Sequence, residues 1–315
     1  MDAWLSVVMP VHEGERWLGE ALSSLAIQDQ AGGIECLVID SSPGEGTNAL
    51  VRAHQDRVRI RLFRRPDLKP WQSKTNFGFE QATAAHVSML HQDDFWLPGR
   101  AALVQAWIRA EPAAVMHLHA SRIVNEVGRV FGRWTCPLPS ETRIDRELLL
   151  GRLLVQNFIS IPSPVIRRDA FRAVGGIDEA LWYTGDWDLY LKLARTGAVL
   201  YHDEVLSAFR IHGRSMTMSG SRHGDDFREQ MVRVLDRHID AVPQPGRTTI
   251  EKLARASIDV NAGLASANRG RAGGLLTAVS AMLSLGPAEI RAFLRDTRLL
   301  ERVRPRVLAR LAGSL

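Results

Sequence analysis

The sequence predicts an α/β fold with a mainly parallel central sheet, followed by a small α-helical appendage at the C-terminus. From Leu5 to Tyr201, short apolar runs alternate with segments of helical periodicity, which is the pattern of a sheet flanked by helices. Beyond residue 243, Ala, Leu and Arg recur with a helical period and without strand-like runs. We therefore expect one large α/β domain with helices after it.

The first βα unit lies at the start of the chain. Leu5–Met9 is an apolar run typical of a buried strand, and we expect Pro10 to end it. Apolar residues then recur at helical spacing, so the next segment is predicted to be a helix that packs one face against the sheet. These residues are Trp17, Leu18, Ala21, Leu22 and Leu25.

Three further strands are expected over Ile34–Ile39, Val58–Leu62 and His86–Leu90, with helices beginning at Asn48 and spanning Ser73–Ala84. Strands of this half of the chain end in polar loops. The carboxyl ends of parallel strands meet at one edge of a sheet, where open α/β folds bind ligands. A binding crevice is therefore predicted at this edge.

The pattern is less regular after the helix predicted over Pro98–Ala110 and the strand over Ala114–His119. A hairpin is expected near Asn125–Gly128, and residues up to about Ile161 are where a substrate-specific insertion would lie. The later predicted elements are helices over Arg168–Val174 and Asp186–Arg195 and a short strand over Val199–Tyr201.

The linker Pro243–Gly246 combines two prolines with a glycine, and we place a domain boundary there. The predicted domains are residues 1–242 and a helical region over 243–315. Helices in the second region are expected over Thr249–Asn268, Arg271–Leu285 and Pro287–Leu300.

Composition excludes several protein classes. The chain of 315 residues is 45% hydrophobic, enough for a full core, and its two cysteines, Cys36 and Cys136, suggest neither a zinc motif nor a disulfide framework. We expect no secretion signal at the N-terminus and no membrane span, because the apolar stretch Leu275–Leu285 is short and interrupted. A cytoplasmic location is the expectation that follows.

The net charge of +5 is concentrated at the C-terminus, where residues 286–315 hold seven arginines and three acidic residues. Such a segment could meet an anionic lipid surface or an acidic partner, or be a solvated helix face. We expect no nucleic-acid partner, because aromatic residues do not alternate with these arginines. Peripheral contact with the inner membrane face and self-association both remain open.

The most informative motif is His91-Gln92-Asp93-Asp94, which follows the apolar run His86–Leu90 directly. Adjacent carboxylates at the end of a strand can bind a hard cation such as Mg²⁺ or Mn²⁺. An Asp-Asp pair in a solvated loop or at a helix N-cap is the alternative, so neighbouring motifs have to decide.

Six motifs in order make residues 4–215 resemble the inverting family 2 glycosyltransferases, whose GT-A fold is a Rossmann-like nucleotide-sugar-binding domain. Two positions depart from the family pattern: Ser41 replaces a second acid after Asp40, and His91 replaces the first acid of the metal motif. The six motifs are Val7–Glu13, Val38–Thr47, Gln72–Gly78, His91–Asp94, Val174–Glu179 with Gly185–Leu189, and Phe209–Ser215.

The resemblance implies a metal-dependent transferase that moves a sugar from a nucleotide diphosphate, with UDP-sugar as the expected donor, to a glycan or lipid-linked acceptor. Asp93, Asp94 and His212 would hold Mg²⁺ or Mn²⁺. Asp186 would be the general base, with a helix N-cap as its alternative role. The nucleotide half would span about 1–97 and the acceptor half about 98–220.

The resemblance also implies a set of nucleotide-binding residues. Asp40 would bind the base or ribose, although an Asx-turn is the alternative. His91 could contact the ribose, join the metal or be structural, and Arg210 and His212 would reach the diphosphate or metal from a loop extending over 213–220. The full set is Pro10, Val11, Glu13, Asp40, Asn76, His91, Gln92 and Arg210; the acceptor-side candidates are Asn157, Trp182 and Trp187.

Three other functions compete with this interpretation. A catalytically decayed nucleotide-sugar-binding protein would explain Ser41 and His91, although Asp93 and Asp186 are present. A nucleotidyltransferase would need a glycine-rich, lysine-bearing phosphate loop after the first strand, which Pro10–Glu15 does not provide. A nucleic-acid-binding module would have to use the basic C-terminus.

Overall fold

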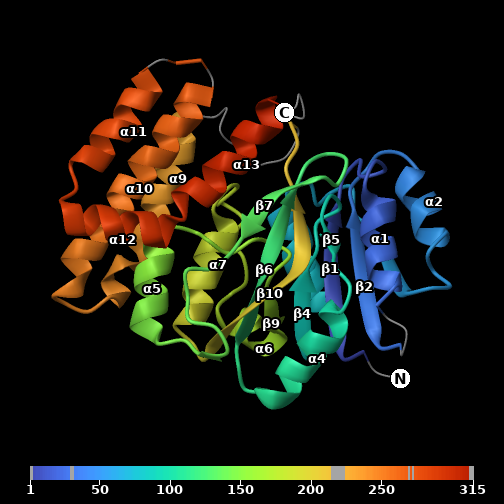
Figure 1. The fold of residues 1–315 in the computed structure, drawn as a ribbon. Helices are drawn as coiled ribbons and strands as arrows, with labels where there is room; N and C mark the ends of the chain where they lie inside the picture. The colour runs from blue at the N-terminus through green and yellow to red at the C-terminus, as the bar shows by residue number, and fades with distance from the viewer. Residues whose placement is uncertain (1–2, 29–31, 214–223, 269, 272, 312–315) are drawn as a thin grey trace.

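A computed structural model describes residues 3–28, 32–213, 224–268, 270–271 and 273–311. One ten-stranded sheet crosses the molecule, with the strand order β3-β2-β1-β4-β9-β6-β10-β5, and with β7 beside β6 and β8 beside β10 (Figure 1). The predicted α/β class is therefore confirmed.

The first half of the sheet is parallel. In it, β1 (Leu5–Val11) lies between β2 (Ile34–Asp40) and β4 (His86–Met89), and β3 (Arg59–Arg64) pairs with the far side of β2. The register places Val11 opposite Asp40 and Asp40 opposite Arg64. All four carboxyl ends therefore meet at one edge, as the sequence pattern predicts.

The second half of the sheet is mixed. β9 (Val165–Arg167) is antiparallel to both β4 and β6 (Met116–Val124), whereas β10 (Val199–Arg210) is parallel to β6. The short β5 (Phe95–Trp96) and β8 (Thr142–Arg143) run antiparallel to β10. The predicted hairpin joins β6 to β7 (Val130–Trp134) through Asn125–Gly128.

Helices cover both faces of the sheet, because strand side chains alternate between the faces. On one face, Val7 and Met9 of β1 pack in a cluster with α1 (Leu18–Ala26) and α4 (Arg100–Ala110). On the other face, Val8 belongs to a larger cluster that also holds side chains of the C-terminal helices described below. The earlier helices in this cluster are α3 (Trp71–Gln81), α5 (Arg146–Val155), α6 (Arg168–Ala173) and α7 (Gly185–Ala194). The remaining helix of this half is α2 (Gly46–Arg52).

The C-terminal helices gather on one side of the sheet, beside α5 and α7 (Figure 1). Residues of α10 belong both to the main core and to a second apolar cluster with α11 and α12. Apolar packing therefore continues across residue 243, and the division into two domains stays a prediction. The elements are α9 (Gly224–His238), the 3₁₀ turn Ile239–Ala241, α10 (Gly246–Asn268), α11 (Gly273–Leu283), α12 (Pro287–Thr297) and α13 (Leu299–Leu311).

Two sequence-based boundaries are wrong. β1 continues through Pro10 to Val11. Pro10 has a ladder partner only in β2, since β4 stops pairing at Val8, and a missing N–H is tolerated on such an unpaired side. β10 is twelve residues long rather than three, because register shifts after His202 let the strand continue through its polar stretch.

Within the described residues, no single helix is long and apolar enough to cross a membrane. Taken together, α11 and α12 are long and apolar enough for a span, but the chain bends by 120° between them.

Gly78 of α3 provides a test of this packing. A Cβ atom there would lie 2.4 Å from Cγ1 of Val8, so α3 contacts the sheet through a position without a side chain. Gly78→Ala should lower the free energy of unfolding by about 1–3 kcal/mol through overpacking. Gly44→Ala is the matched control, because nothing lies within 4 Å of its added Cβ. Urea unfolding measures both, and an unchanged midpoint for Gly78→Ala would contradict the packing described.

Candidate active site

A cavity of about 520 Å³ opens at the carboxyl edge of the sheet. Its lining includes the ends of β1, β4 and β10, the start of α3, the segment from Gln156 to Ile161 with the start of α7, and side chains of α9, α10 and α13. Of the predicted site residues, it brings together Pro10, Glu13, His91, Gln92, Asp93, Asp94, Asn157, Trp182, Asp186, Trp187, Arg210 and His212.

Asp93 and His212 contact each other on one wall of the cavity. The Nε2 atom of His212 lies 2.8 Å from Oδ2 of Asp93, and the imidazole packs on the indole of Trp17, with 4.3 Å between ring centroids. Burial alone would raise the pKa of Asp93, but the hydrogen bond with His212 and the charges of His91 and His212 bring it below its ordinary value. The Asp93 carboxylate is therefore held as an anion.

Asp94 is more deeply buried than Asp93. Its Oδ1 accepts a hydrogen bond of 2.9 Å from the backbone N–H of Arg210. Burial, together with the negative charge of Asp93, raises the pKa of Asp94 well above its usual range. Within the described part of the chain, three buried atoms near Asp93 lack a hydrogen-bond partner: Oδ2 of Asp94, Nε2 of His91 and Nδ1 of His212.

The residues present fit a divalent cation. The donor atoms of Asp93 and His212 are about as far apart as two neighbouring ligands of an octahedral ion, roughly 3 Å. Orphaned polar atoms beside them are expected where a cation or its water completes the site. However, Asp93, Asp94 and His212 do not converge closely as a set of three. Asp94 is instead oriented by Arg210, so it fits a supporting role.

The described residues contain one set of three close metal-ligating side chains, and it lies elsewhere. Ligand atoms of Glu141, His202 and Glu204 are all within 4.8 Å of one another. None of the three lines the cavity. His202 stacks on Trp107, 3.7 Å between centroids, and hydrogen-bonds to His117, which accounts for its burial.

Asp186 faces the cavity from the other wall. It is the second residue of α7, after the N-cap Thr184 and Gly185, so it is not the N-cap itself. Its Oδ2 accepts a hydrogen bond of 3.0 Å from Nδ2 of Asn157. Burial raises the pKa of Asp186 to about 6, although hydrogen bonds from the Trp187 backbone and from Asn157 partly oppose this. A carboxylate with such a pKa can accept a proton near neutral pH.

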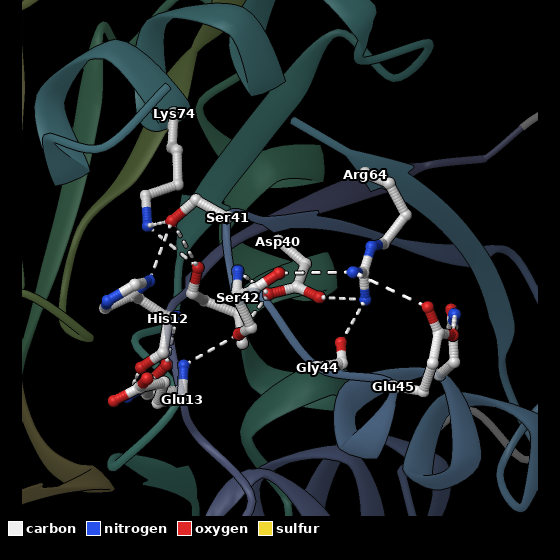
Figure 2. Close-up of polar contacts among 12 residues, drawn as sticks. His12, Glu13, Asp40, Ser41, Ser42, Gly44, Glu45, Arg64 and Lys74 are labelled. Carbon is white, nitrogen blue, oxygen red and sulfur yellow. Dashed lines mark hydrogen bonds and ion pairs between the residues drawn. The ribbon is translucent and has the colours of Figure 1, made fainter. Parts of the chain in front are cut away.

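Asp40 is turned away from the cavity. Its Oδ1 accepts hydrogen bonds from the backbone N–H of Ser42, at 2.8 Å, and from the Ser42 hydroxyl, and its Oδ2 accepts one from Arg64 at 3.0 Å (Figure 2). The contact with Ser42 is the Asx-turn that was the alternative for this position. A contact between Asp40 and the nucleotide stays a prediction.

Lys74 is a cavity residue that sequence reasoning missed. Its Nζ donates hydrogen bonds to the carbonyl of Val11, at 2.8 Å, and to the hydroxyl of Ser41, at 2.9 Å (Figure 2). Burial lowers the pKa of Lys74 to about 8, against the negative charge of Asp40. Ser41, which stands where the family pattern has an acid, therefore contacts the ammonium group of Lys74.

Besides Asp40, two predicted nucleotide contacts lie outside the cavity lining. Val11 is fully buried and reaches Lys74 through its carbonyl. The amide of Asn76 bonds to the backbone of Ile177, at 2.9 Å for both the N–H and the carbonyl, and to Glu179. Asn76 therefore ties α3 to the loop before α7, and its contact with a nucleotide stays a prediction.

Gln92 and Glu13 line the cavity, but backbone contacts orient both of them. The Gln92 side chain pairs with the backbone of His12, accepting from its N–H at 2.8 Å and donating to its carbonyl at 3.1 Å. Glu13 has a positive φ of 48° and donates its N–H to Ser42. These contacts fix the loop after β1 beside the metal motif.

The expectation that Arg210 lies on a loop is wrong, whereas its contact with a ligand stays a prediction, since Arg210 lines the cavity. Arg210 ends β10, and its guanidinium donates to the carbonyls of Asp93, at 2.8 Å, and of Asn125 and Glu126, both at 3.0 Å, and to the carboxylate of Glu20. These contacts use the side chain to fix the loop that carries Asp93. Residues 214–220 of the expected loop lie outside the described residues.

The acceptor-side candidates differ in exposure. Trp182 lines the cavity and donates its indole N–H to Asp226, whereas Trp187 is 5% exposed and donates to the carbonyl of Leu153 at 2.7 Å. Trp187 is therefore mainly a core residue.

Sequence reasoning missed several polar side chains of the cavity lining, because no local motif marks them. These residues are Gln156, Ser257, Asn261 and Arg302.

Comparison with known proteins agrees with this geometry. The family described as Glycosyl transferase family 2 matches residues 6–175. An uncharacterized glycosyltransferase of Rickettsia prowazekii is 22% identical over 232 residues, covering 71% of this chain and 69% of that protein. An uncharacterized protein of Mycobacterium tuberculosis is 23% identical over 249 residues, covering 76% and 68%.

Solved structures share the fold. Residues 1–349 of TarS from S. aureus, in complex with UDP-GlcNAc, align with a TM-score of 0.62 and 18% identity, covering 97% of this chain and 88% of that one. A mannosyltransferase from Pyrobaculum calidifontis, in complex with GDP-Man and Mn²⁺, aligns with a TM-score of 0.55 and 18% identity, covering 96% and 87%. The chain spans 55% of a longer TarS structure.

The structural likeness confirms the GT-A-like fold that the sequence motifs imply. The family match covers more than half of the chain, including β1 to β4 and the Asp93 motif. This protein therefore belongs to glycosyl transferase family 2 and is a glycosyltransferase.

Proposed function

We propose that this protein is a metal-dependent, inverting glycosyltransferase that moves a sugar from a UDP-sugar to a hydroxyl of a glycan or lipid-linked acceptor. The observation that carries the proposal is the arrangement of one cavity: Asp93 beside His212 on one wall and Asp186, with a pKa of about 6, on the other. In this proposal, a cation-binding pair and a proton acceptor would face the same space.

The donor side would be the wall formed by β1, β4 and α3. Asp93 and His212 would hold Mg²⁺ or Mn²⁺, and Asp94 would support Asp93. A bound divalent ion neutralises the charge that develops on a departing diphosphate. Lys74 and Lys69 add positive charge to this wall, which suits an anionic donor. Neighbouring folds with UDP-GlcNAc and GDP-Man support a nucleotide sugar.

Asp186 would act as the general base. It would take the proton from the acceptor hydroxyl as that oxygen attacks the anomeric carbon from the face opposite the leaving group, which inverts the configuration. One carboxylate is sufficient for this single displacement. Asn157 would orient Asp186 and stabilise its ionised form through the hydrogen bond of 3.0 Å.

The acceptor would bind in the half of the cavity between α7 and the C-terminal helices. Trp134, Trp182 and Tyr183 provide aromatic surface there, and Asn261 and Arg302 provide hydrogen-bond donors. Aromatic faces and polar donors together are suited to a sugar. The two buried free cysteines fit the reducing cytoplasm in which we place the reaction.

Asp93→Asn tests the metal site. It keeps the size of the side chain but removes the charge, so calorimetric titration of UDP with Mn²⁺ should show affinity lowered by roughly 100-fold, about 2.7 kcal/mol. UDP titrated with EDTA should bind the wild type and the variant equally weakly. The control is Asp56→Asn, an exposed aspartate just before β3, at the opposite end of the strands. Equal Mn²⁺-dependent binding by Asp93→Asn would refute the site.

Asp186→Asn tests the base. UDP release from UDP-sugars, with water as the acceptor, should fall by about 10²–10⁴-fold while Mn²⁺-dependent UDP binding is retained. In the wild type, kcat/KM should rise with pH and level off above about 6, because the base must be deprotonated. Nucleotide binding with no turnover by the wild type, tested with several nucleotide sugars, would favour the decayed-site alternative.

Asn157→Ala separates positioning from catalysis. Loss of its hydrogen bond removes an interaction that lowers the pKa of Asp186, so the acid limb of the kcat/KM profile should move to higher pH. Activity should fall most at pH 6 and least at pH 8. A uniform loss at all pH values, without a shift of the limb, would show that Asn157 does not tune Asp186.

A further inference from the structure

The helix α11, Gly273–Leu283, exposes an apolar face without a partner among the described residues. It contains no charged residue, yet Leu275, Leu276, Val279 and Leu283 are 56%, 73%, 53% and 76% exposed. Their spacing places them on one side of the helix, since residues three or four apart are neighbours. Contiguous exposed apolar surface of this kind marks an interaction site.

The side of α11 that packs on α10 shows which way the apolar face points. Gly263 of α10 and Gly274 of α11 bring the two helix backbones into contact: a Cβ at Gly263 would lie 2.6 Å from the carbonyl oxygen of Gly274. Ala278 is buried in the same interface. The leucines therefore point away from α10, and Figure 1 shows α11 at the outer edge of the helical region.

The exposed charged residues that flank α11 in the sequence are arginines. Arg271, just before α11, and Arg291, on α12, are both exposed. The acidic residues of α12 are already paired: Glu289 with Lys252 at 2.6 Å, and the buried Asp296 with Arg295 at 2.7 Å and with Arg152 at 3.4 Å. Exposed arginines therefore flank α11 in the sequence on both sides, while the carboxylates of α12 are paired.

We infer that the exposed face of α11, with Arg271 and Arg291, docks on the surface of an anionic lipid bilayer. The leucine side chains would enter the boundary between headgroups and acyl chains, and the arginines would contact anionic headgroups. A second copy of the chain fits less well, because a symmetric dimer through this face would bring the flanking arginines of the two copies together. This inference is independent of the catalytic proposal.

Vesicle flotation of the full chain tests the inference. The protein should float with vesicles of phosphatidylcholine and phosphatidylglycerol, and the bound fraction should fall at high salt and on pure phosphatidylcholine. Leu276→Ser with Leu283→Ser should weaken the partition coefficient by at least about tenfold, because two exposed leucines no longer enter the bilayer. Arg271→Gln with Arg291→Gln should reduce binding and its salt dependence together.

The matched control is Ile27→Ser with Val127→Ser, which removes two large apolar side chains that are 56% and 81% exposed elsewhere. This variant should float like the wild type. Circular dichroism confirms that every variant is folded. The inference is overturned if the wild type does not float with anionic vesicles, if the leucine variant binds as the wild type does, or if sedimentation shows a dimer that this variant abolishes.

Discussion

The hydrogen bonds of Arg210 are the interaction on which the cavity depends. This buried side chain joins four segments: the loop of Asp93, the β6–β7 hairpin, helix α1 through Glu20, and its own strand β10. Its backbone N–H also holds Asp94. A buried guanidinium is costly unless each donor is satisfied, and here carbonyls and carboxylates satisfy it. The position of Asp93 is thus set by a residue 117 positions away.

The two walls of the cavity are positioned by different means. The donor-side wall is a property of the sheet, because parallel strands place β1, β2 and β4 side by side and their loops meet at one edge. The other wall depends on polar links between loops and helices, such as the hydrogen bond that Asn157 donates to Asp186 and the one that Asn261 donates to Gln156 at 2.9 Å. The first wall is built mainly on the sheet edge, with Arg210 fixing the loop of Asp93, whereas the second depends on hydrogen bonds of a few side chains.

Sequence reasoning was most accurate where periodicity carries the information. The strands at Leu5, Ile34 and His86 and the carboxylates Asp93 and Asp186 follow from local pattern and motif order, and the structure places both carboxylates in one cavity. It failed where tertiary contacts decide. Asn76 and Arg210 match family motifs but use their polar atoms within the protein. Lys74 lies within the Gln72–Gly78 motif, but that motif does not show that its side chain reaches the cavity. Asn261 and Arg302 reach the cavity from helices whose local sequences carry no signal of it.

The basic C-terminal segment shows the same limitation. Its charge left an anionic lipid surface, an acidic partner and a solvated helix face open as interpretations. In the structure, Arg302 lines the cavity, Arg298 pairs with Glu301, and Arg295 pairs with Asp296. Only the folded arrangement separates the arginines that act inside the protein from those that face solvent, such as Arg291.

Helix α10 separates the cavity from α11, so its diameter contributes to the distance between the cavity and the proposed membrane surface. Asn261 lines the cavity while Gly263, two residues later and on the opposite side of the helix, contacts α11. One turn of α10 therefore has the cavity on one side and α11 on the other. A bilayer at the outer face of α11 would lie two helix diameters from the cavity, roughly 20 Å. An acceptor anchored in that bilayer would have to extend over at least this distance, which favours an elongated head group over a compact one.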